Sequence, residues 1–349
     1  MRRRKTRKIY YGGKAVGGEA PITVQSMTTT KTADVNETVR QIKKLEAVGC
    51  EIIRVAVPDM ESAEKLSKIK KSINIPLIAD IHFDYRLAIK AIKQRVDGLR
   101  LNPGNIGNAE RVKEIVLMAK EYSVPIRVGV NSGSVEREIL KKYGRPTAEG
   151  MVESALKHIR ILEENDFDDI VISLKSTDIL MTIQAYQLMA ERVNYPFHIG
   201  ITEAGTSWSG TIKSSIGIGA LLAQGLGDTI RISLTGDPVE EVKVGWQILK
   251  SLRLRNRGAE IISCPTCGRT EINLINLAEE VEKRFGDLDK DITIAVMGCA
   301  VNGPGEAREA DIGIAGGKSE GLIFRKGKLI RKVPESQLLR VLEDEIEKL

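Results

Sequence analysis

Short runs of β-branched and other apolar residues recur along residues 22–234, and each run is followed by a segment with helical periodicity. Such runs are typical of buried strands. They lie at Ile22–Ser26, Ile52–Val57, Leu77–Asp80, Gly98–Leu101, Ile126–Val130, Ile170–Ser173, His198–Ile201 and Thr229–Leu234. Eight strand–helix units within about 250 residues predict a TIM (β/α)₈ barrel. A doubly wound open sheet is the alternative, but no Gly-x-Gly-x-x-Gly motif follows the first run.

Two of the expected helices carry clear start signals. Asp34 stands three residues before Glu37, and Asp237 precedes Pro238 at the first helical position. Acceptor side chains of this kind cap the free N–H groups of a helix, and proline is tolerated at its first position. Ser215-Ile-Gly217-Ile-Gly219 is expected to open the helix after the seventh strand, where backbone N–H groups bind phosphate.

The pattern changes after the eighth unit. We expect a strand near Ile261, a helix over Glu271–Phe285, a strand over Ile292–Val296, short strands near Ile312 and around Gly327, and a closing helix over Glu335–Leu349. Strands and helices mixed in this way predict a smaller α+β domain. The expected organisation is therefore a basic N-terminal tail and lead-in at 1–20, a TIM barrel at 21–258 and an α+β domain at 259–349.

The composition is that of a soluble globular protein, with 42% hydrophobic and 29% charged residues and a mean hydropathy of −0.15. No run approaches the ~20 apolar residues that span a bilayer. The basic N-terminus is followed by no continuous apolar segment, which argues against a secretory signal. We therefore predict a cytoplasmic protein with no membrane partner.

The net charge of +6 is concentrated at the N-terminus. Six basic residues fall within the first eight positions, so the remainder of the chain is formally neutral. A short basic tail is a weak nucleic-acid signal, and aromatic residues, which would stack on bases, make up only 4% of the chain. We interpret the tail as a solvated, frayed terminus and predict no nucleic-acid partner.

Basic side chains lie inside or directly after five of the eight predicted strands. They are Arg54, Arg100, Arg127, Arg231 and Lys175, while acidic residues stand at comparable positions only at Asp80 and Glu203. The carboxyl ends of the strands carry the active site of a TIM barrel. One interpretation is internal ion pairing, but buried guanidinium groups without partners are costly. The surplus of positive charge therefore favours a phosphate ligand, whose oxygens suit arginine forks.

Three of the four cysteines lie in the α+β domain. Cys264-Pro-Thr-Cys267 has a spacing shared by zinc ribbons, redox dithiols and iron–sulfur sites, and Cys299 follows later. Three thiolates suit a [4Fe–4S] cluster in which one iron has another ligand, and Glu306 follows Cys299 closely enough to be that ligand. Structural zinc is the alternative, although a zinc ribbon needs a fourth Cys or His. Cys50 is interpreted as a core cysteine.

Six motifs together resemble the 4-hydroxy-3-methylbut-2-enyl diphosphate synthases of the non-mevalonate isoprenoid pathway. They are VQSMT at 24–28, ADIHFD at 79–84, LRLNPGN at 99–105, ITEAG at 201–205, CPTCGR at 264–269 and MGCAVNGPGE at 297–306. The resemblance runs from about Pro21 to the C-terminus and is to the compact two-domain bacterial form. It implies that 2-C-methyl-D-erythritol 2,4-cyclodiphosphate is opened and loses an oxygen as water, with two electrons delivered singly through the cluster.

The resemblance also implies a role for each matching residue. The diphosphate would be clamped by Arg54, Arg100, Arg127, Arg231 and Lys175, with polar contacts from His82, Asn102, Asn131 and Ser233. Glu203 would act as acid or base at a hydroxyl, and Cys264, Cys267, Cys299 and Glu306 would hold the cluster. The family is described as head-to-tail homodimers with active sites shared between subunits, and flavodoxin or ferredoxin would supply the electrons.

Two other functions are compatible with parts of the pattern. A redox-silent TIM-barrel transferase or aldolase with a structural zinc domain would use the same anion site without an iron–sulfur cluster. A nucleic-acid-binding protein would use the basic tail. An absorption band near about 400 nm separates an iron–sulfur enzyme from both.

Overall fold

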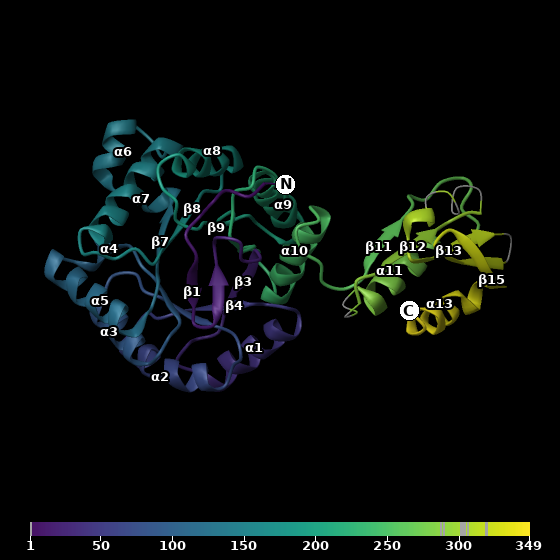
Figure 1. Cartoon of the computed structure of the whole chain (residues 1–349), viewed down its shortest axis with the longest axis horizontal. Coiled ribbons are helices and arrows are strands. Elements are labelled where there is room, and N and C mark those ends of the chain that lie inside the picture. The colour runs from purple at the N-terminus through teal and green to yellow at the C-terminus, as the bar shows by residue number, and fades with distance from the viewer. Residues whose placement is uncertain (1, 287, 289, 301–304, 306, 318–319) are drawn as a thin grey trace. The chain divides into compact units, whose positions relative to one another are not determined.

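The computed structural model describes all residues except 1, 287, 289, 301–304, 306 and 318–319. The chain forms two compact units, Met1–Arg255 and Asn256–Leu349, each with its own hydrophobic core (Figure 1). Among the described helices, none is both long enough and apolar enough to cross a membrane.

The first unit is built on eight parallel strands. They are β3 (Thr23–Met27), β4 (Ile52–Ala56), β5 (Leu77–Asp80), β6 (Gly98–Arg100), β7 (Ile126–Asn131), β8 (Ile170–Lys175), β9 (His198–Ile199) and β10 (Thr229–Ile230). Their order in the sheet is β8-β7-β6-β5-β4-β3-β10-β9. A further parallel bridge between Ile172 and Phe197 joins β8 to the residue before β9 and closes the barrel. The predicted TIM barrel is confirmed, although β9 and β10 are shorter than expected.

Helices alternate with these strands and surround the barrel (Figure 1). They are α1 (Val35–Ala47), α2 (Met60–Lys71), α3 (Tyr85–Lys93), α4 (Pro103–Ile106), α5 (Ala109–Tyr122), α6 (Arg137–Tyr143), α7 (Ala148–Glu163), α8 (Ile179–Ala190), α9 (Ser207–Ala223) and α10 (Pro238–Ser251). Both start signals are confirmed, because Asp34 accepts from the Glu37 N–H and Asp237 from the Val239 N–H.

The interpretation of Ser215 to Gly219 as a helix start is wrong. Helix α9 begins at Ser207, so this segment lies in its middle and its N–H groups belong to the helix. Gly217 serves packing instead, because a Cβ there would lie 2.6 Å from Cδ1 of Ile201. The glycine lets α9 approach the end of the seventh barrel strand closely.

A hairpin precedes the barrel and closes the end opposite its mouth. Strands β1 (Ile9–Tyr11) and β2 (Lys14–Val16) are antiparallel, and their apolar side chains pack on residues near the amino-terminal ends of β4, β5 and β8. The expectation of a frayed tail is wrong. Arg3 pairs with Asp228 at 2.9 Å, and Arg4 donates to the Val193 carbonyl and lies over the Phe197 ring.

The second unit is a five-stranded mixed sheet with helices, as the predicted α+β class requires. Its elements are β11 (Glu260–Ser263), α11 (Leu274–Phe285), β12 (Thr293–Met297), β13 (Ile312–Gly317), β14 (Glu320–Arg325), β15 (Lys328–Pro334) and α13 (Leu338–Glu347). Strands β11, β12 and β13 are parallel and β14 and β15 antiparallel. The short strands expected around Gly327 are β14 and β15, and Gly327 lies in the turn between them at φ 72°.

Candidate active site

The five predicted cations of the barrel face a common interior. Arg54, Arg100 and Arg127 lie in strands, Lys175 ends β8, and Arg231 follows β10. Burial holds the pKa of Lys175 well below its ordinary value, and the four arginines lower it further, which shows how close the charges are. The alternation of charged and β-branched residues along the strands therefore predicted correctly that these side chains face the barrel interior.

Asp80, at the end of β5, lies between two of these arginines. Its carboxylate oxygens are 3.6 Å from Arg54 Nε and 3.3 Å from Arg100 Nη1. Burial by itself would raise the pKa of Asp80, but the two arginines outweigh it and the pKa falls below its usual range. Asp80 is therefore ionised, and it compensates about one of the positive charges.

Arg127 is the deepest of the cations, with 1% of its surface exposed. Its Nη1 donates to Gln25 Oε1 at 2.5 Å, whereas Nε and Nη2 are buried without an acceptor in the described part of the chain. Burial lowers the pKa of Arg127 to about 10, so the side chain is still charged at neutral pH. Unpaired guanidinium N–H groups at this depth are costly, which favours an anionic occupant.

The carboxylate near Arg231 is one that the sequence analysis missed. Glu241, on α10, is buried; its Oε2 is 3.7 Å from Arg231 Nη2, and its Oε1 accepts from the Leu234 N–H at 2.9 Å. The Nε of Arg231 has no acceptor among the described residues. No strand-end pattern signals Glu241, because it comes from the first turn of the following helix.

Glu203 does not occupy the interior position that its place after the seventh strand suggested. Its side chain is exposed, and its backbone has φ 51°, which turns the residue away from the strand direction. The interior therefore holds five cations and two carboxylates, Asp80 and Glu241, among the residues that the structure describes. The predicted surplus of positive charge remains, but the second compensating carboxylate is Glu241 and not Glu203.

The four predicted polar residues occupy different surroundings. Asn102 is buried and makes two bonds to the backbone of Gly129, accepting from its N–H and donating to its carbonyl, both at 2.9 Å. Arg100 Nη2 donates to the same carbonyl at 2.8 Å. His82 is exposed with Nε2 3.4 Å from Arg100 Nη1. Asn131 and Ser233 are partly buried, at the end of β7 and after β10.

His198 is a second residue that the sequence analysis missed. It is fully buried on β9, with Nε2 3.4 Å from Lys175 Nζ and Nδ1 3.4 Å from Thr229 Oγ1. Burial and the surrounding cations hold the pKa of His198 well below its ordinary value, so the ring is neutral. A neutral ring nitrogen is an acceptor suited to the Lys175 ammonium.

Two of the three predicted cysteine ligands lie at the carboxyl ends of neighbouring parallel strands. Ser263 of β11 is in register with Val296 of β12, so Cys264 and Cys299 follow at the same edge of the sheet. The Gly298 N–H donates to Cys264 Sγ at 3.2 Å. Such a bond to sulfur stabilises a thiolate, and thiolates are the ligands of iron–sulfur clusters.

Cys267 lies in a turn closed by the Thr270 N–H, which donates to its carbonyl at 3.0 Å. It is exposed, and no group of three or more His, Cys, Asp and Glu side chains gathers at metal-binding range among the described residues. The predicted ligand Glu306 lies outside the described residues. The donor set nevertheless fits a soft metal centre, because two thiols share one sheet edge and a third follows three residues after one of them.

We expect Cys267 to be the first thiol alkylated in metal-free protein. A hydrogen bond from the Arg269 backbone, and then the Arg269 charge, lower the pKa of Cys267, whereas burial raises the pKa of Cys50 to about 12. The thiolate is the reactive form. Iodoacetamide labelling followed by peptide mass spectrometry checks this, and Cys50 labelled as fast as Cys267 would contradict it.

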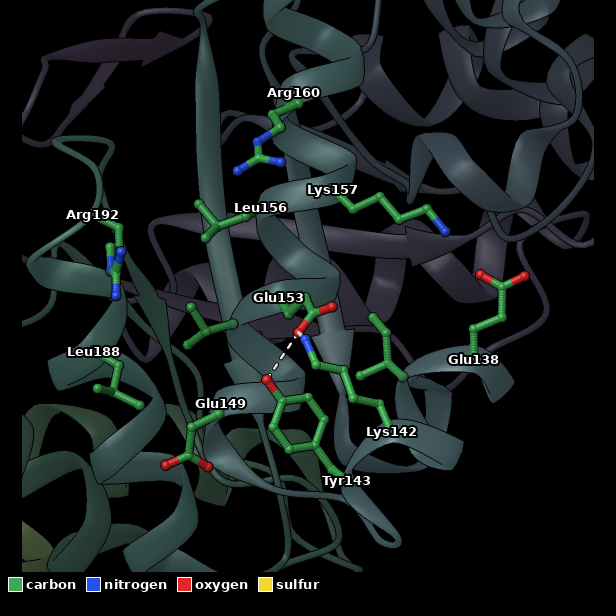
Figure 2. A pocket seen from close by; sticks show the side chains of 12 residues that line it. Glu138, Lys142, Tyr143, Glu149, Glu153, Leu156, Lys157, Arg160, Leu188 and Arg192 are labelled. Carbon is green, nitrogen blue, oxygen red and sulfur yellow. Dashed lines mark hydrogen bonds and ion pairs between the residues drawn. The ribbon is translucent and has the colours of Figure 1, made fainter.

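A groove of about 700 Å³ lies away from these residues, between α6, α7 and α8. Figure 2 shows Lys142 and Tyr143 beside Glu153, to which both donate, and Arg192 on the opposite side. None of the predicted site residues lines this groove.

A (β/α)₈ barrel whose mouth carries more cations than carboxylates among the described residues, followed by a cysteine-bearing α+β unit, defines a two-domain enzyme class that acts on an anionic substrate. The chain belongs to the GcpE family. Residues 6–246 match the family model described as GcpE TIM-barrel domain, and residues 260–348 match the GcpE protein C-terminal domain. The family resemblance inferred from the motifs is confirmed.

Relatives of high identity carry one name. The chain is 61% identical to the 4-hydroxy-3-methylbut-2-en-1-yl diphosphate synthase (flavodoxin) of Geobacter sulfurreducens, over 99% of this chain and 98% of the relative. It is also 61% identical to the protein of the same name from Clostridium tetani, over 99% of each. The 3-dehydroquinate dehydratase of Geobacillus kaustophilus covers 73% of this chain and 100% of its own, at 15% identity and a TM-score of 0.51, which supports the fold alone.

Proposed function

We propose that this chain catalyses the reductive dehydroxylation and ring opening of 2-C-methyl-D-erythritol 2,4-cyclodiphosphate. The products are (E)-4-hydroxy-3-methylbut-2-enyl diphosphate and water, and the reaction consumes two electrons. The names of the relatives support this reaction. The structural observation that carries it is the barrel interior, where Nε and Nη2 of Arg127 and Nε of Arg231 are buried without acceptors from the described residues. A diphosphate supplies the missing charge and acceptor oxygens.

The substrate site consists of the side chains at the carboxyl ends of the strands. We assign the diphosphate to Arg54, Arg100, Arg127, Lys175 and Arg231, with Asn131 and Ser233 adding polar contacts and His82 lying beside Arg100. Asn102 acts through the backbone of Gly129, to which Arg100 also donates. Because Arg54, Arg100 and Arg127 already make internal bonds, little reorganisation of these groups accompanies binding.

Glu203 is assigned to proton transfer at a substrate hydroxyl. Its carboxylate is exposed and at the end of the strand that leads to α9. A carboxylate can accept a proton from a hydroxyl that comes within hydrogen-bonding distance. Because its side chain is exposed, it is accessible for that contact.

The second unit is assigned to cluster binding, over residues 259–349. Cys264, Cys267 and Cys299 would hold three irons of a [4Fe–4S] cluster and Glu306 the fourth. When bound, the cluster supplies the electrons one at a time. We propose flavodoxin as the donor, in agreement with the names of the relatives, with ferredoxin as the alternative. The relatives give no support to a zinc-containing transferase or aldolase.

We further propose that the enzyme is a cytoplasmic head-to-tail homodimer in which each cluster unit completes the barrel mouth of its partner. Arg255, the last residue of the barrel unit, donates to the Ile22 carbonyl and pairs with Glu51. Both partners directly precede strands, β3 and β4, so the chain leaves the barrel at the end opposite the mouth. In a heterologous contact between two copies, the cluster unit of one copy can complete the barrel of the other.

The anion site is tested with Arg231→Ala. Removal of a buried guanidinium that contacts phosphate should weaken binding of the cyclic diphosphate by about 2–4 kcal/mol. Isothermal titration of the cluster-loaded protein measures this, and the visible absorption of the cluster should not change. Arg40→Ala is the matched control, because Arg40 is exposed on α1 and pairs only with Glu37 three residues away in the described structure. Equal affinity in the two variants would contradict the site.

A further inference from the structure

His158 is a buried histidine that joins two loops at the barrel mouth. It lies on α7 and is 2% exposed. Its Nδ1 accepts a hydrogen bond from the Gly104 N–H at 3.0 Å, and its Nε2 lies 3.4 Å from Glu136 Oε1. Gly104 belongs to α4, the short helix in the β6–α5 connection, and Glu136 to the loop between β7 and α6. One side chain on the outer helix layer therefore contacts both connections.

The bond from Gly104 fixes the protonation state of the ring. A backbone N–H can only donate, so Nδ1 carries a lone pair and the proton of the neutral ring is on Nε2. Nε2 lies 3.4 Å from Oε1 of Glu136, whose two carboxylate oxygens are buried and accept no hydrogen bond within the described residues. Burial lowers the pKa of His158. Glu136 raises this pKa, but Lys157 and Arg100 lower it further, so the ring stays neutral.

The connection that His158 holds begins directly after β6, whose last residue is Arg100 of the anion site. Asn102 lies two positions before Gly104, and its side chain bonds both backbone groups of Gly129. Arg100 Nη2 donates to the same Gly129 carbonyl, so Arg100 and Asn102 share one anchor on β7. On the other side, Asn131 begins the second loop, with its N–H donating to Ser134 Oγ at 3.0 Å.

We propose that His158 and Glu136 are positioning residues that clamp the loops after β6 and β7 and so preorganise Arg100, Asn102 and Asn131 for the substrate anion. The proposal rests on the proposed function and deepens it. The contact between His158 and the backbone at position 104 requires glycine, because a Cβ there would lie 2.7 Å from His158 Cε1. A larger residue would push the ring away from the backbone N–H that it accepts from.

A pair of substitutions separates this role from simple packing. In His158→Asn the side-chain oxygen can replace Nδ1 as acceptor, whereas His158→Leu fills a similar volume without one. We expect the Leu variant to bind the cyclic diphosphate about ten- to hundredfold more weakly, because displaced binding groups lose affinity steeply. The Asn variant should bind close to the unchanged protein, and both should keep the cluster absorption. Calorimetric titration of the cluster-loaded proteins measures the affinities.

Unchanged affinity in the Leu variant, or an equal loss in both variants, would overturn the positioning role. If the unchanged protein itself fails to bind the cyclic diphosphate, the proposed function fails first. If the Leu variant does not fold, ¹⁵N NMR of the unchanged protein tests which ring nitrogen of His158 carries the proton. The His158 signals are assigned by their loss in the Asn variant. A proton on Nε2 is expected, and a proton on Nδ1 would exclude the bond from Gly104.

Discussion

A Cys299→Ser substitution is expected to abolish iron and sulfide incorporation and all turnover, while the barrel remains folded. Cys299 is buried at the end of β12, beside Gly298, whose N–H donates to Cys264 Sγ. A serine hydroxyl at this place is a hard, neutral group and a poor ligand for the metals that thiolates bind. The loss should therefore be complete rather than partial. Iron and sulfide analysis of anaerobically purified protein, with the visible spectrum, measures it.

Cys50→Ser is the matched control for this substitution. Cys50 is also buried, but it lies in the barrel core and its Sγ donates to the Ile52 carbonyl at 3.2 Å. A hydroxyl can make the same bond, so iron content per chain should equal that of the unchanged protein. One equivalent of zinc in the unchanged protein, with no iron or sulfide, would contradict the cluster assignment and restore the structural zinc alternative.

The barrel and its cations were predictable because both follow from strand periodicity. An arginine that alternates with β-branched neighbours must point opposite to them, as Arg127 does. The compensating carboxylates were only half predictable. Asp80 ends a strand and was found in this way, whereas Glu241 reaches the interior from a helix, and Glu203 turns outward at φ 51°. Which helical side chain faces a given strand end depends on how the two pack, which no local pattern records.

The basic tail shows a different limit of sequence reasoning. Composition indicated a solvated terminus, yet Arg3 pairs with Asp228, and Arg4 donates to main-chain carbonyls at Val193 and Tyr195. These acceptors are more than 180 residues away in the sequence. A charge run is recognised as structural only when its distant acceptors are known, and a single sequence does not contain that information. The role of His158 is likewise not visible in the sequence, because its partner Gly104 is 54 residues away.

The proposed trans arrangement of active sites rests on where the chain leaves the barrel. Arg255 is fixed at the amino-terminal ends of β3 and β4, and β11 begins at Glu260. The chain between these residues spans at most about 18 Å. Helix α10, which returns the chain from mouth to bottom, is 14 residues and therefore about 21 Å long. The chain therefore enters the second unit from the end of the barrel opposite its mouth, which supports the proposal that a second copy provides the cysteines.

Mixing two inactive variants is therefore expected to restore activity. Glu203→Gln keeps its cysteines but cannot exchange the proton, and Cys299→Ser keeps Glu203 but has no cluster. In a head-to-tail heterodimer, one of the two sites combines the intact barrel of one chain with the intact cluster unit of the other. With complete random exchange, half of the dimers are mixed, so activity should reach about one quarter of that of the unchanged enzyme.

The control for this mixing experiment is the double variant Glu203→Gln/Cys299→Ser, combined with either single variant. No site in those mixtures has both groups, so activity should stay at the level of the parents. Native mass spectrometry with an isotope-labelled chain shows whether mixed dimers form. If they form and the two single variants still show no activity together, each cluster unit serves its own barrel, and the trans arrangement is wrong.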